Sequence, residues 1–494
     1  RMTRNPESWG KPLGALLGAL KMQVELGLPS IGGKDSMSGT FQHINVPPML
    51  MAFGITTVNA GTVISTDFKK AGNRIYLVRH TPRENHMPDT AQLKENFGFV
   101  SENIERGNIL AAWSVGFGGV AEGLAKMAFG NRIGAEVEMD EAELFGYAYG
   151  SILVESAVEL THPAAGLLGM TAAEGALTVN GVKMPLDALY KANTEKFAAV
   201  YPDKGENHAG VMTSEPAPRT FAYRGEAVEH PLVYIPVFPG TNCEYDTARA
   251  CIRAGIDPEI VVVRNLTTDF LTQSAQALEQ AIRAAQMVVI PGGFSGGDEP
   301  EGSGKFIASF LRSPALADAI MDLLKNRDGL MLGICNGFQA LVKLGLVPYG
   351  EIRDMDETCP TLTYNLIGRH QSSYVTTRVA SVNSPWMLKS QVGDLHTIPI
   401  SHGEGRFVAP QSALESLIAN GQVATQYVDA AGQPTMDIAF NPNGSISAIE
   451  GIFSPDGRVM GKMGHLERRG QYVGVNIPGN KHQPLFESGA EYFK

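Results

Sequence analysis

The chain has 494 residues, of which 44% are hydrophobic and 18% charged, and its formal net charge is -11. This length exceeds a single core and predicts two or three domains. The acidic balance argues against a nucleic-acid partner, and no apolar run approaches the roughly 20 residues of a membrane span. The cysteine usage shows no metal-finger spacing and indicates a reducing, cytoplasmic compartment. Because the sequence begins at Arg1 rather than methionine, we expect a fragment of a longer protein.

The first segment, residues 1–62, combines a helix with a polar loop. Apolar spacing predicts the helix over residues 13–27. A glycine-bearing loop follows at residues 30–38, where an ammonium group and hydroxyls suit phosphate oxygens and a carboxylate suits Mg²⁺. The candidate side chains are Lys34, Asp35, Ser36 and Ser38. Because the Walker A spacing is absent, a simple hairpin turn is the alternative.

Residues 63–202 alternate strand and helix signals and predict an α+β layer. Strands are expected at 73–79, 134–138 and 151–155, and helices at 116–129 and 185–199. Residues 203–230 are polar, contain prolines and lack periodicity, so they are assigned to a linker. The remaining residues, 231–494, form the last domain.

In that last domain short apolar strands alternate with helices. The strands are predicted at 232–238, 259–264, 287–290 and 329–334. The helices are predicted at 244–254, 271–285 and 305–326. Such alternation predicts a parallel sheet covered by helices on both faces, with its chemistry at the C-terminal ends of the strands.

A nucleophile elbow is predicted at Cys335, between the last of these strands and a helix. Gly333 and Gly337 flank it as G-x-C-x-G, since a sharp strand-to-helix turn excludes neighbouring side chains. We expect an exposed sulfur whose thiolate is favoured by the helix N-terminus, with the Asn336 N–H aimed at an oxyanion. A buried structural cysteine is the alternative, and Cys243 is the rival nucleophile, although it lacks the flanking glycines.

The other candidate catalytic groups lie far from the elbow in sequence. His465 would accept the thiol proton and Glu467 would orient the imidazole, which completes a Cys-His-Glu triad. Gly292 and Gly293 directly follow a strand, so their N–H groups are either oxyanion donors or part of a tight turn. Gln339, one turn into the elbow helix, either seats the substrate amide or caps the turn.

These motifs resemble the class I, triad-type glutamine amidotransferases. The elbow matches, and Gly464-His-Leu-Glu-Arg468 stands where that family usually has P-H-P-E-R, so the base loop is expected to be less rigid. Stretches 238–249, 291–295 and 401–406 are similar to the glutaminase domain of the phosphoribosylformylglycinamidine synthase family. The implied fold is a flavodoxin-like α/β glutaminase, with a parallel sheet between helices, preceded by an α+β aminoimidazole-ribonucleotide-synthetase-like half.

The resemblance also implies chemistry and partners. The family is a ligase of purine biosynthesis that uses glutamine, formylglycinamide ribonucleotide and ATP with Mg²⁺, and its full-length form is expected to be a monomer. The resemblance assigns Asp35 to the metal and the neighbouring serines to a nucleotide. The ribonucleotide site is expected mostly in a missing N-terminal part, the first synthetase-like half. Gly116-Phe-Gly-Gly-Val120 replaces the family's usual S-D-G-G-L, which indicates that the half present here is not the catalytic one. His402 and Glu404 are expected near the glutaminase site, in contact with substrate or with the neighbouring domain.

Three other functions compete with this interpretation. Another synthase with a class I glutaminase component would share the elbow and the base. A cysteine peptidase of the same fold would release peptides rather than ammonia. A nucleotide-binding scaffold with a vestigial glutaminase would bind ligand without turnover.

Overall fold

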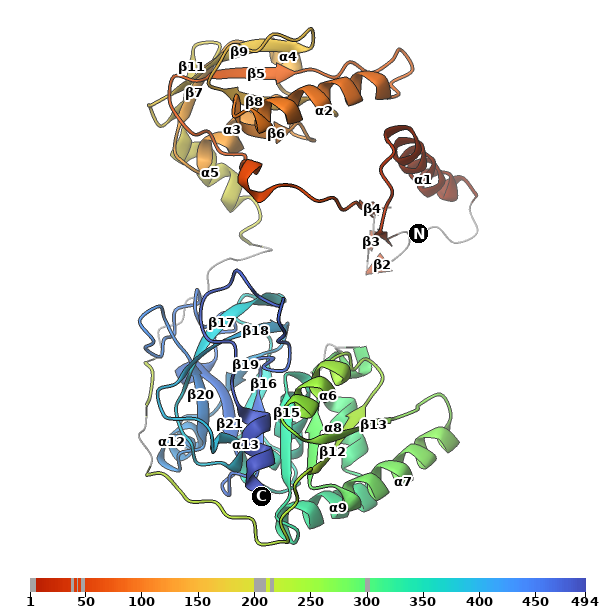
Figure 1. Cartoon of the computed structure of the whole chain (residues 1–494), viewed down its shortest axis with the longest axis vertical. Coiled ribbons are helices and arrows are strands. Elements are labelled where there is room, and N and C mark those ends of the chain that lie inside the picture. The colour runs from red at the N-terminus through yellow and green to blue at the C-terminus, as the bar shows by residue number, and fades with distance from the viewer. Residues whose placement is uncertain are drawn as a thin grey trace. The chain divides into compact units, whose positions relative to one another are not determined.

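The computed structural model describes residues 6–36, 40–41, 43–45, 49–199, 210–213, 217–297 and 303–494. The chain divides into two compact units, residues 1–197 and residues 198–494, which we call unit 1 and unit 2 (Figure 1). Each unit has its own sheet and its own buried core.

Unit 1 begins with helix α1, Pro6–Leu26, which starts earlier than the apolar spacing predicted. Strand β1, Gly32–Ser36, then pairs antiparallel with β4, Met49–Phe53. Part of the expected polar loop at 30–38 is therefore a strand. A Cβ at Gly33 would lie 2.5 Å from the Met51 carbonyl oxygen, so this glycine is required by the strand pairing itself. The short pieces that follow are β2 (Thr40–Phe41), β3 (Ile44–Asn45) and the 3-10 turn η1 (Ala60–Thr62).

The main sheet of unit 1 has seven described strands in the order β11-β10-β7-β9-β5-β8-β6. They are β5 (Arg74–Val78), β6 (Ile109–Ser114), β7 (Gly134–Val137), β8 (Ile152–Ser156), β9 (Ala165–Ala172), β10 (Ala176–Val179) and β11 (Val182–Pro185). The helices are α2 (Thr90–Glu105), α3 (Gly119–Phe129), α4 (Glu141–Leu144) and α5 (Leu186–Glu195). Along β5, Ile75 and Leu77 join the core under α3, whereas Tyr76 and Val78 join the core under α2. Because alternate strand residues face opposite sides, the helices cover both faces.

Unit 2 is built on a nine-stranded sheet in the order β13-β12-β14-β15-β22-β21-β20-β17-β18. Its strands are β12 (Leu232–Val237), β13 (Asp257–Val262), β14 (Met287–Ile290), β15 (Leu330–Ile334), β17 (Gln371–Val379), β18 (Leu395–His402), β20 (Val423–Tyr427), β21 (Ile449–Phe453) and β22 (Val459–Lys462). The β13 to β22 half is parallel, as predicted. The β21 to β18 half is antiparallel, which the alternation of strands and helices did not predict.

Helices cover the parallel half of this sheet on both faces, since every residue of β14 and β15 is buried. The helices of unit 2 are α6 (Glu244–Arg253), α7 (Thr268–Ala284), α8 (Lys305–Leu311), α9 (Pro314–Lys325), α10 (Asn336–Leu344), α11 (Leu346–Tyr349), α12 (Gln411–Ala419) and α13 (Leu485–Tyr492). A small two-stranded sheet joins β16 (Thr361–Thr363) to β19 (Arg406–Val408), and 3-10 turns occur at η2 (Ser295–Gly297), η3 (Pro385–Met387) and η4 (Ile446–Ala448).

The single helix predicted over residues 305–326 is wrong, because the structure has α8 and α9 there. Ser313 is extended, with φ -58° and ψ 140°, immediately before Pro314. A proline disfavours helical backbone at the preceding residue but is well placed in the first turn of a helix. Pro314 therefore ends one helix and starts the next.

Much of the segment assigned to the linker lies against unit 2. The Arg219 N–H donates to Asn383 Oδ1 at 2.9 Å, and the Val228 N–H donates to the Phe493 carbonyl at 2.8 Å. Arg224 forms an ion pair with Asp328, and Phe221 packs against the core. Residues 217–230 therefore pack against the rest of unit 2.

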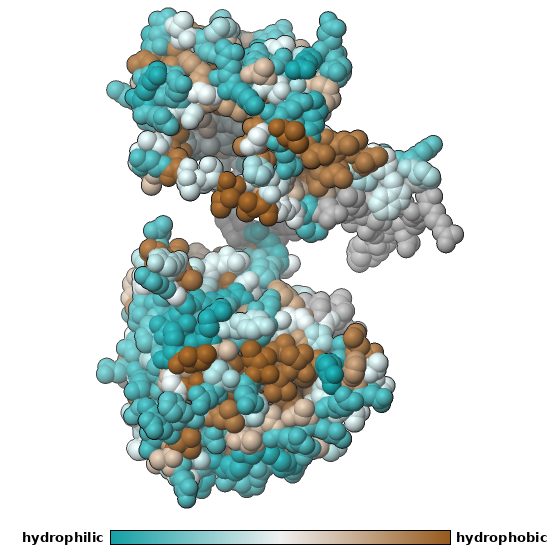
Figure 2. Space-filling model, turned by 45° about the vertical axis from the view of Figure 1, so that its right-hand side comes forward, coloured by the Kyte–Doolittle hydropathy of each residue, from teal (hydrophilic) through white to brown (hydrophobic). Residues whose placement is uncertain are grey.

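Apolar side chains are also present on the surface of both units (Figure 2). They include Trp9, Leu13, Leu16, Leu17, Leu20 and Val24 of α1, which are at least half exposed. Within the described residues, none of the helices combines the length and the apolar character that crossing a membrane requires.

Candidate active site

The elbow at Cys335 has the strained geometry that its glycines predicted. Cys335 joins β15 to α10 with φ 51° and ψ -105°, a positive φ that is uncommon outside glycine. A Cβ at Gly337 would lie 2.0 Å from the Ile290 carbonyl oxygen, and one at Gly333 would lie 2.7 Å from that of Gly337. Both flanking positions therefore exclude any side chain, and the strain falls on the cysteine between them.

The expectation of an exposed, ionised sulfur is wrong in this structure. The Cys335 residue is only 5% exposed, and its Sγ lies 3.8 Å from the Ser401 carbonyl oxygen at the end of β18. Burial, together with nearby Cys243 and Glu467, raises the pKa of the Cys335 thiol to about 12. The Asn336 N–H lowers this pKa but does not outweigh desolvation. The cysteine therefore rests as a thiol and needs a base.

His465 and Glu467 form a buried pair next to the elbow. His465 Nδ1 lies 2.6 Å from Glu467 Oε1, and each residue is 1% exposed. The Glu467 carboxylate fixes the tautomer with hydrogen on Nδ1, which leaves Nε2 as the basic nitrogen. Nε2 has no hydrogen-bond partner among the described residues. An unpaired basic nitrogen in a buried site is free to take a proton from a reacting group.

Gly292 is the point where the candidate catalytic groups meet. A Cβ built on it would lie 2.6 Å from His465 Cε1, 3.4 Å from Cys335 Cβ and 3.3 Å from Cys243 Sγ. At Gly293, with φ 148°, a Cβ would lie 2.6 Å from Thr241 Cα. These glycines are required because the loop after β14 runs directly between the nucleophile, the base and the loop after β12.

Asn336 and Gln339 belong to one buried chain of hydrogen bonds. The Ser295 N–H donates to Asn336 Oδ1 at 3.2 Å, and Asn336 Nδ2 donates to Gln339 Oε1 at 3.0 Å. Gln339 Nε2 in turn donates to the Glu404 carbonyl at 2.5 Å. The amide of Gln339 is therefore already used within the protein, where it joins the elbow helix to the 401–406 loop.

Cys243, the rival nucleophile of the sequence analysis, also lies in this site, beside His465. Its Sγ lies 2.9 Å from an Arg468 guanidinium nitrogen and 3.9 Å from His465 Nδ1. Its position after β12, the neighbour of β14, was the available signal, since parallel strands end at one edge of the sheet. Burial raises the pKa of the Cys243 thiol to about 11, and Glu467 adds to this effect.

One group among the described residues has the composition of a metal site. The candidate ligand atoms of Cys243, His465 and Glu467 lie within 4.8 Å of one another. However, the Arg468 guanidinium contacts the Cys243 sulfur and places a positive charge beside them. That charge opposes a cation, so the group is poorly suited to hold a metal ion.

The 401–406 loop borders the catalytic residues. Besides the Ser401 carbonyl near Cys335, it holds His402, whose Nδ1 lies 3.2 Å from Asn365 Oδ1. Burial, followed by the charges of His465 and His370, lowers the pKa of His402 to about 3, so its ring is neutral. Glu404 Oε2 accepts the Ser303 N–H at 2.8 Å. Both residues therefore support the walls of the site.

The candidate nucleotide residues belong to unit 1, whereas the catalytic group belongs to unit 2. Lys34 is an exposed residue of β1. The side chains of Asp35 and Ser36 and the whole of Ser38 lie outside the described residues.

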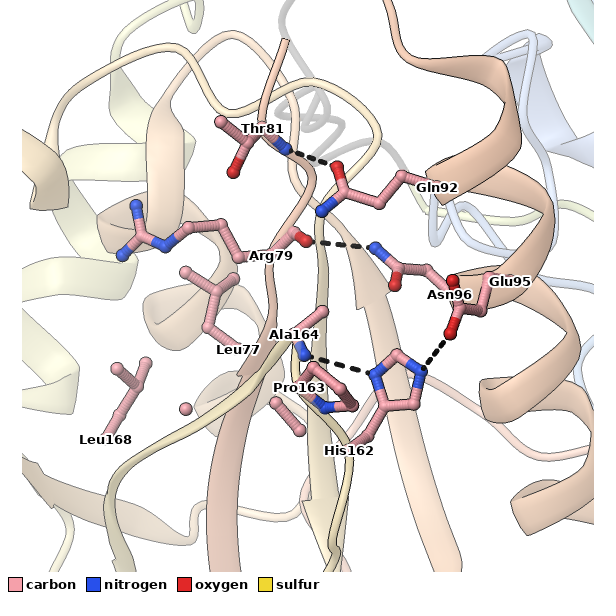
Figure 3. A pocket seen from close by; sticks show the side chains of 12 residues that line it. Leu77, Arg79, Thr81, Gln92, Glu95, Asn96, His162, Pro163, Ala164 and Leu168 are labelled. Carbon is pink, nitrogen blue, oxygen red and sulfur yellow. Dashed lines mark hydrogen bonds and ion pairs between the residues drawn. The ribbon is translucent and has the colours of Figure 1, made fainter.

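A separate cavity of about 330 Å³ lies in unit 1 (Figure 3). His162 Nε2 lies 3.7 Å from Glu95 Oε1, and His162 Nδ1 accepts the Ala164 N–H at 3.2 Å. Asn96 Nδ2 donates to the Arg79 carbonyl at 2.9 Å. These contacts join α2 to the ends of β5 and β9, and Asn96 Oδ1 is buried without a partner among the described residues.

Comparisons with known proteins concern mainly unit 2. Residues 230–493 match the family model described as a CobB/CobQ-like glutamine amidotransferase domain. The chain is 35% identical over 240 residues to phosphoribosylformylglycinamidine synthase subunit PurQ of Aquifex aeolicus, a match that spans 48% of this chain and 90% of that protein. It is 37% identical over 241 residues to the subunit of the same name from Treponema denticola, across 46% of this chain and 84% of that protein. A solved structure, PurLQS from Thermotoga maritima, matches with 26% identity and a TM-score of 0.39, and covers 54% of this chain and 100% of that one.

Proposed function

The chain belongs to the CobB/CobQ-like glutamine amidotransferase family, and from that premise we propose that unit 2 hydrolyses glutamine at Cys335 with His465 as the base. Glu467 is the carboxylate that orients the base. The observation that carries the proposal is the meeting of the strained Cys335 elbow and the His465–Glu467 pair around Gly292.

The reaction begins when the Cys335 sulfur attacks the side-chain carbonyl carbon of glutamine and its proton passes to His465 Nε2. The oxygen of the tetrahedral intermediate gains negative charge, and the N–H groups of Asn336 and Gly293 are the proposed donors to it. The carbon–nitrogen bond then breaks, and the amine takes the proton from His465 and leaves as ammonia. Water, deprotonated by His465, cleaves the glutamyl thioester and releases glutamate.

The burial of the site suits a reaction whose product, ammonia, should not escape into solvent. A thiol with a pKa of about 12 does not react unless a base removes its proton as it attacks. Since the sulfur rests against the Ser401 carbonyl, glutamine has to displace this contact when it binds. The low solvent exposure of the site also limits the loss of the released ammonia to bulk solvent.

The test is to label the chain with an electrophilic glutamine analogue and to map the modified residue by mass spectrometry. We expect the label on Cys335 and no label on the Cys335→Ala variant. Cys243→Ala is the matched control, since it removes the neighbouring thiol and keeps the elbow. A label on Cys243 in the unmodified chain would contradict the proposal, and absence of any label would favour a vestigial glutaminase.

We also propose that the ammonia serves the synthase named in the relatives. In that reaction ATP, with Mg²⁺, activates the amide of formylglycinamide ribonucleotide, and ammonia from unit 2 converts it to the amidine. The relatives named as PurQ subunits support this assignment for unit 2. In the full-length synthase, Cys335→Ala should abolish the glutamine-dependent reaction and leave the reaction with free ammonia. Loss of both would refute the division of labour.

A nucleotide and Mg²⁺ site at Lys34, Asp35, Ser36 and Ser38 is a further part of this proposal. Its support is that residues 33–36, G-K-D-S, resemble the nucleotide-binding loop of the synthetase-like half in this family. Asp35→Ala should lower the nucleotide content of the purified protein while Cys335 labelling stays unchanged. Equal nucleotide content in the two proteins would remove Asp35 as a ligand.

A further inference from the structure

A buried ion pair holds the backbone immediately before the catalytic histidine. The Gly464 N–H donates to Glu450 Oε1 at 2.6 Å, and Lys462 Nζ donates to the Gly464 carbonyl at 3.2 Å. The Lys462 and Glu450 charges lie 3.2 Å apart, and both side chains are 0% exposed. Glu450 therefore binds the backbone N–H of Gly464, the residue that precedes His465, and Lys462 binds its carbonyl.

Burying this ion pair costs free energy of desolvation, so a gain in stability does not by itself explain its presence. Moving a carboxylate and an ammonium out of water costs several kcal/mol per ion, and apolar replacements of such pairs are often neutral or stabilising. The remaining oxygen of Glu450 accepts a hydrogen bond from the Thr425 hydroxyl. Both charged groups are therefore hydrogen-bonded, and among their partners is the backbone of the base loop.

Glycine at position 464 explains why the loop needs this support. A Cβ there would lie 2.2 Å from Ile398 Cδ1 and 2.9 Å from Glu450 Oε1, so a larger residue would require both side chains to move. A proline would also lack the N–H that Glu450 accepts. Glycine is the most flexible residue of the chain, and a flexible residue next to the base has to be fixed by its surroundings.

Lys462 also connects the base loop to the nucleophile. Its carbonyl accepts the Cys335 N–H at 2.8 Å, while its ammonium holds Gly464. The Met463 N–H donates to the Glu450 carbonyl at 3.1 Å, which joins the same loop to β21. Lys462 therefore binds the backbone of Cys335 and also the backbone of Gly464, the residue before His465.

We propose that Lys462 and Glu450 are positioning residues that set the His465 imidazole relative to the Cys335 sulfur. This inference deepens the proposed glutaminase function and rests on it. An ion pair clamped on a glycine supplies here the rigidity that prolines beside the histidine would otherwise provide.

The experiment compares three full-length variants with the unmodified chain. Lys462→Met/Glu450→Gln removes both charges, keeps the side-chain volumes and deletes the donor to Gly464. Lys462→Met alone leaves a buried carboxylate without its cation. The matched control is Asp328→Asn, which removes the partner of Arg458 at the opposite end of β15 and β22. Each variant is assayed for thermal unfolding and for Cys335 labelling by the glutamine analogue across pH, with rates expressed per folded molecule.

We expect the double variant to unfold only slightly earlier than the unmodified chain, because the Gly464 carbonyl loses a donor but no buried charge is left unpaired. Its Cys335 labelling at neutral pH should be roughly 100-fold slower, the cost of a misplaced catalytic group. The rate should then rise steadily with pH, because the thiolate fraction grows as pH approaches the thiol pKa of about 12. Lys462→Met should show the same loss and also unfold earlier. Asp328→Asn should unfold earlier but label at the normal rate.

Normal labelling per folded molecule in both Lys462 variants would overturn the positioning role. The same slowing in Asp328→Asn would also overturn it, since the effect would then be general destabilisation. If the unmodified chain itself labels Cys335 only at high pH, the glutaminase proposal fails instead.

Discussion

Gly292→Ala tests the geometry of the site with a single methyl group. The new Cβ would lie 2.6 Å from His465 Cε1, whereas ordinary contacts begin near 3.4 Å. The imidazole must therefore retreat by about 0.8 Å, or the loop must move by a similar distance. A displacement of about 1 Å in a catalytic group costs roughly 100-fold in rate. Overpacking of this kind also costs about 1–3 kcal/mol of stability.

The assay measures Cys335 labelling and glutamate release for Gly292→Ala, alongside thermal unfolding. Gly470→Ala is the control, because its new Cβ would meet nothing closer than 3.5 Å. We expect the first variant to lose about two orders of magnitude in rate and the second to behave like the unmodified chain. The reasoning fails if Gly292→Ala keeps its full rate, since the methyl group would then not reach the base.

Two further predictions concern stability. Burial lowers the pKa of His396 to about 4. Between pH 6.5 and 4 this histidine is therefore protonated in the unfolded chain and neutral in the folded chain. Stability should therefore fall as pH drops through this window, and His396→Gln should flatten that slope in urea unfolding measured at pH 7 and pH 5; equal slopes would exclude His396 as the source. Trp386, fully buried, donates from Nε1 to the Met331 carbonyl at 3.1 Å. Trp386→Phe should cost about 1–3 kcal/mol by leaving this carbonyl short of a donor, and a smaller change would mean that water replaces the indole.

The strand pattern and the elbow were readable from sequence because both depend on neighbouring residues. Apolar runs flanked by helices predicted β12, β14 and β15 closely. Gly333 and Gly337 predicted a turn at Cys335 that excludes neighbouring side chains. The structure has that turn, with φ 51° at the cysteine. The local rule failed at Pro314, where one residue divided an expected helix.

The sequence by itself determined which chemical groups the site contains, since the elbow and the His-x-Glu pair are short-range motifs. Only the tertiary structure decided their surroundings. β22 pairs with β15 in the sheet, and this places Lys462 beside Cys335 although 127 residues separate them. Three other contacts follow from strand order in the same way. Arg468 contacts Cys243, the Ser401 carbonyl covers the Cys335 sulfur, and the Lys462–Glu450 ion pair binds Gly464. No local pattern encodes such contacts, because they depend on which distant strands become neighbours and on the water that their packing excludes.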